Sequence, residues 1–205
     1  VFEPEVLLLD EPLSNLDAKL RLQTGDEFRA LQRRLGITTL YVTHDQEEAM
    51  ALSDRIVVMH AGKILQSGAP EDIYRRPVRR EVAAFFGSPN LLDARVAGAT
   101  AEPDGTYRVA VRGEGWEGTC RAAEAFASGT AVLVMIRPED VHMIAPDAVA
   151  VDQQVVWRGR VIDTIFRGAR RSIVVDVDGR RFNVESPSLQ KFNSGEPVVM
   201  AALAG

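Results

Sequence analysis

The first side chains in the sequence that could do chemistry are two acids that directly follow an apolar run. Val6 to Leu9 are all apolar, and Asp10 and Glu11 come next, before Pro12. Such a run predicts a strand that is buried on both faces and ends at the acids. In parallel sheets the carboxyl ends of the strands form the crevice where ligands bind, so the acids are expected at a binding site. The alternative is that they are loop acids near the positive end of a helix.

The segment after the acids predicts a turn followed by a helix. Pro12 fixes φ and lacks a backbone donor, so the chain must leave the sheet there. Ser14 or Asn15 can then cap a helix that begins near Leu16. Apolar residues recur at helical spacing until Gly36, which has the residue type favoured just after a helix ends.

A histidine follows the next apolar segment. Ile37 to Val42 is rich in β-branched residues and predicts a second buried strand, and His44 comes directly after it. Because parallel strands end at one edge of a sheet, we expect His44 on the same rim as Asp10 and Glu11.

Two stretches of this first part resemble the ATPases of ABC transporters. Residues 6–21, VLLLDEPLSNLDAKLR, are similar to the Walker B segment and D-loop of that family, and residues 41–74 are similar to its H-switch and the strands after it. The resemblance implies ATP hydrolysis, in which a protein mainly positions the reactants and stabilises charge. Asp10 would then hold Mg²⁺ through water, Glu11 would be the general base for the attacking water, and His44 would contact the γ-phosphate.

The same resemblance implies partners for the protein. ABC ATPases close two nucleotides between two subunits, so a second copy of the subunit is expected, together with membrane permease subunits. The implied location is the cytoplasmic face of the cell membrane. Four residues of the D-loop would meet the nucleotide and the opposing subunit: Ser14, Asn15, Leu16 and Asp17.

Three motifs that the family carries before its Walker B strand are missing from the sequence. A P-loop requires Gly-x-x-x-x-Gly-Lys-Ser/Thr, whose amides and lysine hold the phosphates. Here the single Gly-Lys pair, Gly62-Lys63, has Val57 and Ile64 at the other required positions. There is also no signature motif and no glutamine loop. We therefore expect a rear portion of a longer ATPase, which alone binds ATP poorly or not at all and is catalytically incomplete.

Composition excludes several other classes of protein. The chain is 46% hydrophobic and 26% charged, with a formal net charge of −5, which argues against nucleic-acid binding. No apolar run approaches the length of a membrane span. The single cysteine, Cys120, permits no internal disulfide, in agreement with a reducing cytosol.

After Gly87 the pattern changes to short β runs divided by glycine-rich turns, so we place a domain boundary near Ser88. The second part contains an internal repeat. Arg95 lies 34 residues before Gly129, and Arg160 lies 35 residues before Gly195. Two five-stranded units of similar plan are expected, each like a small OB-fold.

Parts of this second segment resemble the TOBE regulatory domain of importer ATPases. The similar stretches are residues 90–92, residues 136–140 and the closing strands. That domain follows the ATPase in importers of maltose, polyamines, iron, sulfate and related solutes, and it implies a small-molecule ligand. A β-barrel without a ligand is the alternative.

The predicted architecture is thus a partial P-loop α/β core over residues 1–87, followed by an all-β, OB-like TOBE domain over residues 88–205. The first functional hypothesis is an energy-coupling ATPase subunit of an ABC importer. The second is a regulatory or interaction module that binds a solute or partner, or mediates dimerisation, without nucleotide. The third is a chain that exposes sheet edges and pairs with a copy of itself.

Overall fold

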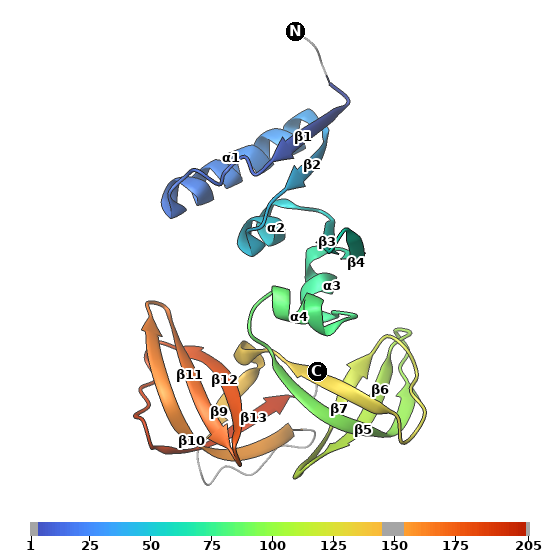
Figure 1. Ribbon diagram of the computed structural model, residues 1–205, viewed down its shortest axis with the longest axis vertical. Helices are drawn as coiled ribbons and strands as arrows, with labels where there is room; N and C mark the ends of the chain where they lie inside the picture. The colour runs from blue at the N-terminus through green and yellow to red at the C-terminus, as the bar shows by residue number, and fades with distance from the viewer. Residues whose placement is uncertain (1–3, 145–153, 204–205) are drawn as a thin grey trace. The chain divides into compact units, whose positions relative to one another are not determined.

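The computed structural model describes residues 4–144 and 154–203, and its chain divides into two compact units between Gly87 and Ser88 (Figure 1). The first unit contains four helices and four short strands among its described residues. The described residues of the second unit form strands and one short 3-10 helix. None of the helices in these two ranges is long and apolar enough to cross a membrane.

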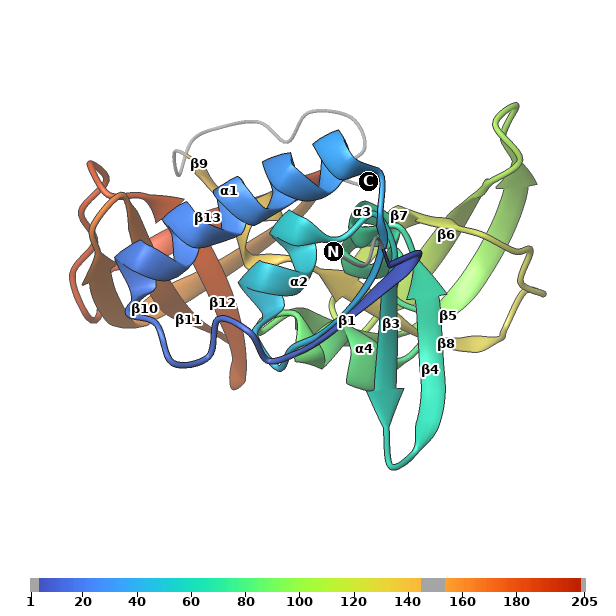
Figure 2. The ribbon, with the colours of Figure 1, turned by 90° about the horizontal axis from the view of Figure 1, so that it is seen from above.

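The first unit begins with a parallel pair of strands joined by a helix. Strand β1 (Val6–Asp10) pairs with β2 (Thr38–Val42), and Asp10 lies opposite Val42. Helix α1 (Ala18–Leu35) connects them and lies beside them (Figures 1 and 2). Because the strands are parallel, both run out at the same edge of the sheet.

The prediction that the first strand is buried on both faces was wrong, and the second predicted strand is likewise covered on one face only. Helix α1 covers one face of the pair, where the rings of Phe28 and Tyr41 lie 6.0 Å apart. On the other face Leu8 is 70% exposed and Leu40 is 58% exposed, and no described element covers them. A strand is buried on both faces only when a layer packs on each side, and here only one layer does so.

The cap of α1 also differs from the prediction. The helix begins at Ala18, and its N-cap is Asp17, whose side chain accepts a hydrogen bond from the backbone N–H of Leu20 at 2.9 Å. Ser14 instead donates its hydroxyl to the carbonyl of Glu11 at 2.9 Å, within the turn that leaves β1. The helix ends as predicted at Gly36, which has a left-handed φ of 66°.

A glycine within α1 allows a second helix to come close. Gly25 is the buried residue of α1, and a β-carbon there would lie 3.4 Å from a methyl group of Leu52. Leu52 ends α2 (Gln46–Leu52), which lies alongside α1 (Figure 2). The space between the helices therefore admits one methyl group and little more.

We expect Gly25→Ala to stabilise the chain by about 0.5–1 kcal/mol, because alanine favours a helix over glycine and its methyl group fits. Gly25→Leu should instead destabilise it by about 1–3 kcal/mol, because the larger side chain overpacks the contact with Leu52. Urea denaturation followed by circular dichroism measures both free energies of unfolding. Equal losses for the two variants would contradict this account of the helix contact.

The remainder of the first unit is a hairpin and two short helices. Strands β3 (Ile56–His60) and β4 (Lys63–Gly68) meet at the two-residue turn Ala61-Gly62, whose residues both have positive φ. Helix α3 (Pro70–Arg75) begins at a proline, the residue type favoured at the first position of a helix, and α4 (Arg80–Phe85) follows. Their small core consists of Ile56, Val58, Ile73, Val82 and Phe86.

The second unit is built from two antiparallel sheets. The first has the strand order β7-β6-β5-β8. Its strands are β5 (Asn90–Ala101), β6 (Tyr107–Gly113), β7 (Trp116–Ala122) and β8 (Ala131–Ile136). The second sheet has the order β12-β11-β10-β13-β9. Its strands are β9 (Val141–Ile144), β10 (Gln154–Arg167), β11 (Arg170–Val177), β12 (Arg180–Pro187) and β13 (Pro197–Leu203), and the 3-10 helix Pro138–Asp140 precedes β9.

The two sheets repeat one plan. β5 to β8 and β10 to β13 have the same strand order, and β9 adds a fifth strand to the second sheet only. Arg95 donates to the carbonyl of Gly129 at 3.0 Å, and Arg160 donates to that of Gly195 at 3.0 Å. The two arginine-to-glycine spacings in the sequence thus correspond to the same hydrogen bond. The first sheet has four strands in the described residues, one fewer than expected.

One apolar core lies within this unit and contains side chains of both sheets. Trp157 is central to it, with ring centroids 6.3 Å from Trp116 and 5.1 Å from Phe182. At the start of β5 the buried Asn90 exchanges two hydrogen bonds with the backbone of Asn183, at 2.8 and 2.7 Å. A buried side-chain amide is costly unless paired, and here the pairing ties β5 to β12.

Candidate functional site

The rim predicted from the sequence is present at the ends of β1 and β2. Nδ1 of His44 lies 2.9 Å from Oε1 of Glu11, although the two residues are 33 positions apart. The backbone N–H of Glu11 donates to the carbonyl of Val42 at 2.8 Å. This bond continues the strand pairing by one residue. It places Glu11 at the edge of the sheet, close to His44, which follows β2.

Glu11 has an unusual backbone conformation. Its φ is 45°, in the left-handed region that residues with a β-carbon rarely adopt. Such strain persists only where the surroundings impose it, and it is concentrated at functional sites. The Glu11 backbone donates to Val42 and accepts hydrogen bonds from Ser14, and its carboxylate contacts His44.

The Glu11 carboxylate raises the pKa of His44 above 6.5, first through the hydrogen bond and second through its negative charge. Both effects favour the imidazolium form. The pair therefore stabilises the fold below the ordinary pKa of 6.5, and this contribution is lost as pH rises through the higher folded-state pKa. The side chains of His44 and Glu11 are 75% and 44% exposed, so solvent screens the interaction.

We expect an NMR titration of the His44 ring to give a midpoint above 6.5 in the wild-type chain. Glu11→Gln should lower that midpoint, because the amide carries no charge. The matched control is Glu117→Gln, which removes an exposed glutamate on β7 and should leave the His44 titration unchanged. A His44 midpoint that does not move in Glu11→Gln would contradict the assigned pair.

Asp10 offers a single exposed carboxylate as a magnesium ligand. Its side chain is exposed at the last position of β1. Among the residues that the structure describes, no group of three or more His, Cys, Asp or Glu side chains could hold a metal ion. Mg²⁺ commonly uses one or two carboxylates together with water and substrate phosphates, so a single exposed carboxylate is compatible with this ion.

The loop of residues 14–17 leaves the rim through two turns. The N–H of Ser14 donates to the carbonyl of Glu11 at 3.2 Å, and that of Leu16 donates to Leu13 at 3.1 Å. Asn15 and Asp17 are exposed, and Asp17 caps α1. The loop is thus attached to the backbone of Glu11 at one end and to a helix at the other.

Sequence reasoning missed a charged cluster behind the rim. Glu48 on α2 has a side chain only 7% exposed, and its Oε2 accepts hydrogen bonds from Tyr41 and Thr43, both at 2.9 Å. Burial, together with the Glu48 carboxylate, raises the pKa of Tyr41. Arg21 on α1 supplies the compensating positive charge, with Nε 3.6 Å from Glu48. No signal in the sequence indicates this pairing, because the burial of Glu48 depends on how α1 packs against α2.

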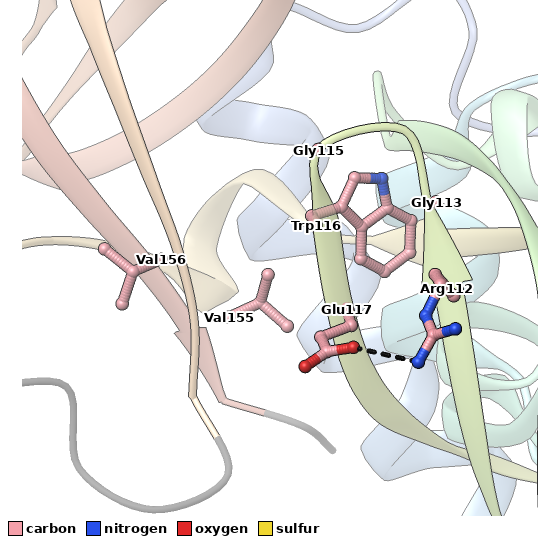
Figure 3. A pocket seen from close by; sticks show the side chains of 7 residues that line it. All are labelled: Arg112, Gly113, Gly115, Trp116, Glu117, Val155 and Val156. Atoms are coloured by element: carbon pink, nitrogen blue, oxygen red, sulfur yellow. Dashed lines mark hydrogen bonds and ion pairs between the residues drawn. The ribbon is translucent and has the colours of Figure 1, made fainter.

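A shallow cavity of about 470 Å³ lies within the second unit (Figure 3). Arg112 and Glu117 line it and are already paired with each other at 3.4 Å. The buried indole nitrogen of Trp116 has no hydrogen-bond partner in the part of the chain that the structure describes, and a β-carbon at Gly113 would clash with it. The indole therefore lies against the Gly113 backbone. Because the charged side chains that line the cavity already pair with each other, the cavity indicates no class of ligand.

Comparison with known proteins shows what the chain is similar to. Residues 134–204 match the TOBE domain family. Over nearly its whole length the chain is similar to ATP-binding subunits of bacterial ABC importers, which agrees with the resemblance seen in the Walker B, D-loop and H-switch stretches. The OB-like all-β character of the second unit agrees with the TOBE match.

Two relatives illustrate the relationship. The chain is 42% identical, over 100% of its length, to a spermidine/putrescine import ATP-binding protein of Nitratidesulfovibrio vulgaris, and it covers 56% of that protein. It is 42% identical, over 97% of its length, to an sn-glycerol-3-phosphate import ATP-binding protein of Rhizobium johnstonii, of which it covers 51%. The chain thus spans about half the length of these curated relatives.

A solved structure of the cytoplasmic molybdate-binding protein ModG aligns with this chain at 11% sequence identity and a TM-score of 0.45. The alignment covers 56% of this chain and 90% of the ModG chain. A similarity at that level supports no conclusion about ligand binding.

Proposed function

We propose that this chain is part of an ATP-hydrolysing subunit that drives solute import, with residues 4–87 supplying the hydrolytic side of the nucleotide site. The observation that carries the proposal is the contact between Glu11 and His44 at the ends of two parallel strands, next to Asp10. The α/β segment β1-α1-β2 is interpreted as part of a P-loop core. The relatives' names supply ATP as the nucleotide.

Each residue of the rim has a distinct task in the proposed reaction. Asp10 holds Mg²⁺, which when bound neutralises charge on the phosphate oxygens. Glu11 accepts a proton from the attacking water and so acts as general base. His44 uses Nδ1 for Glu11 and directs the other ring nitrogen to the γ-phosphate. Because Glu11 favours the imidazolium form, His44 can place positive charge beside that phosphate.

The proposed partners follow from the relatives and from the exposed D-loop. Ser14, Asn15, Leu16 and Asp17 would contact the nucleotide and a second copy of the subunit. Membrane permease subunits would convert hydrolysis into transport, and the protein would act at the cytoplasmic face of the membrane. Relatives of this chain include seven proteins named for spermidine and putrescine import, so polyamines are the first solutes to test.

A second function is proposed for the β unit, because residues 134–204 match the TOBE domain. In this version the unit binds a solute or a regulatory protein, or holds the dimer together, without nucleotide. Isothermal titration of the chain with spermidine, putrescine and sn-glycerol-3-phosphate tests the solute version. Heat of binding without ATP supports it, and no heat with any of the three solutes counts against it.

The transport proposal is tested by uptake in cells. The full-length gene product is the natural protein that contains residues 1–205, with whatever sequence surrounds them. Deleting its gene should abolish uptake of a radiolabelled solute, starting with putrescine and spermidine. Wild-type protein supplied in trans should restore uptake, and Glu11→Gln should not. Restoration by Glu11→Gln would show that hydrolysis at this rim does not drive import.

A further inference from the structure

One arginine connects the two loops of the candidate site. Nη2 of Arg21 donates to the carbonyl of Leu16 at 3.0 Å, within the loop of residues 14–17. Nη1 donates to Oδ2 of Asp45 at 3.0 Å. Asp45 is the neighbour of His44, so a single guanidinium holds both the loop proposed to face the second subunit and the loop that carries the histidine.

Asp45 is fixed on both of its carboxylate oxygens. Oδ1 accepts hydrogen bonds from the backbone N–H groups of Glu47 at 2.8 Å and Glu48 at 3.2 Å, and so caps α2. Oδ2 is the oxygen that meets Arg21. The backbone on the C-terminal side of His44 is therefore held between helix α2 and the Arg21 guanidinium on α1.

The third guanidinium nitrogen faces a buried charge. Nε of Arg21 lies 3.6 Å from Oε1 of Glu48, whose other oxygen is bonded to Tyr41 and Thr43. Nη1 and Nη2 thus donate hydrogen bonds to two oxygens in directions fixed by the planar group, and Nε forms only an ion pair with a third oxygen. Lysine would keep the positive charge but would lose this geometry, because its ammonium is a single point of contact on a flexible stem.

The helices that carry this cluster are in direct contact one turn further along. Gly25 follows Arg21 by four residues, Leu52 follows Glu48 by four, and a β-carbon at Gly25 would touch Leu52. Residues four apart lie on one face of a helix, so the ionic contact and the apolar contact occupy the same interface. The backbone that carries Arg21 is therefore held in place by the packing of α1 against α2.

We propose that Arg21 is a positioning residue which couples the loop of residues 14–17 to His44. A change at Leu16 when the partner subunit docks is passed through the guanidinium to Asp45, and from there to the histidine beside Glu11. This inference rests on the proposed function, since it assigns Arg21 a task in ATP hydrolysis. The coupling works by geometry, so it requires the arginine fork as well as a positive charge.

The test compares Arg21→Lys with wild type in the full-length gene product. We expect kcat for ATP hydrolysis to fall about 10- to 100-fold, the cost of a displaced catalytic group, with KM for ATP nearly unchanged. The thermal midpoint should stay close to that of wild type because the charge is retained. Arg34→Lys is the matched control, since Arg34 is an exposed arginine on the same helix, and it should leave kcat, KM and the midpoint unchanged.

A double-mutant cycle separates positioning from general destabilisation. Asp45→Asn keeps the oxygen that caps α2 and removes the charge that meets Arg21. If the contact between the two residues positions His44, the double variant Arg21→Lys/Asp45→Asn should be no slower than the slower single variant. Additive losses in log kcat would overturn the proposal, including when the variants also unfold at a lower temperature.

The outcomes distinguish this inference from the proposed function. If the wild-type full-length protein does not hydrolyse ATP, the proposed function fails and the inference fails with it. If wild type hydrolyses ATP, Glu11→Gln does not, and Arg21→Lys equals wild type, the proposed function stands and the role of Arg21 is refuted. Loss in Arg21→Lys with non-additivity supports both.

Discussion

Replacing Glu11 with glutamine is expected to slow ATP hydrolysis by the full-length gene product about 10²- to 10⁴-fold, the usual contribution of a general base. Glutamine has nearly the same shape as glutamate and can still bond to His44, but its amide cannot accept a proton from water. ATP affinity should therefore be retained while turnover is lost. Phosphate release and equilibrium nucleotide binding measure the two quantities separately.

The control for this prediction is Glu117→Gln, which makes the same chemical change at an exposed site on β7. It should leave turnover unchanged. A Glu11→Gln protein that hydrolyses ATP as fast as wild type would show that Glu11 is not the base. A protein that has lost ATP binding as well would show that Glu11 acts on the ground state rather than on the reaction.

The largest expected effect on stability is that of Phe182→Ala in the β unit, about 3–5 kcal/mol of unfolding free energy. Phe182 is 2% exposed, and its ring centroid lies 5.1 Å from that of Trp157. Truncation removes the contact with Trp157 and leaves a cavity that the surrounding strands fill only in part. Urea denaturation followed by tryptophan fluorescence reports this change, because Trp157 lies beside the lost ring.

Phe166→Ala is the matched control, since Phe166 is 64% exposed and lies in the same sheet. Its main aromatic interaction is with the guanidinium of Arg171, 5.7 Å from the ring centroid. We expect a loss of about 1 kcal/mol or less, the range for an exposed cation–π contact. Similar losses for Phe182→Ala and Phe166→Ala would contradict the assignment of the core to the Trp157 region.

Features set by local backbone chemistry were predictable from the sequence. Ala61-Gly62 and Asp178-Gly179 both adopt the positive φ values of two-residue hairpins, and Gly36 ends α1 in the left-handed conformation. In each case the residue type or the turn length restricts the backbone before any tertiary contact forms. The meeting of Glu11 and His44 was also predictable, because the parallel strands bring their ends to one edge.

Features that depend on packing partners were not predictable in the same way. The run from Val6 to Leu9 indicates burial on both faces, but burial requires a layer on each side, and α1 provides one. Three polar residues before α1 are good caps, and only the path of the turn selects Asp17 over Ser14 and Asn15. Local preference thus predicted correctly that a polar side chain caps α1, but it did not predict which residue forms the cap.

The cluster around Arg21 was missed for a related reason. Its members come from α1, β2 and α2, and nothing in their spacing along the chain shows that they converge. From the sequence, Glu48 is expected on the exposed face of an amphipathic helix. It is buried because α1 packs against α2. The close contact at Gly25 and Leu52 decides this placement, and it is visible only in three dimensions.

The central claim is that residues 4–87 carry the hydrolytic side of an ATP site whose phosphate-binding side is supplied by other sequence. The most direct test is Mg²⁺-dependent ATP hydrolysis, measured side by side on the 205-residue chain and on the full-length gene product. We predict turnover by the full-length protein that is abolished by a magnesium chelator, and none by the 205-residue chain. Failure of the full-length protein to hydrolyse ATP would contradict the claim, and so would equal hydrolysis by the 205-residue chain.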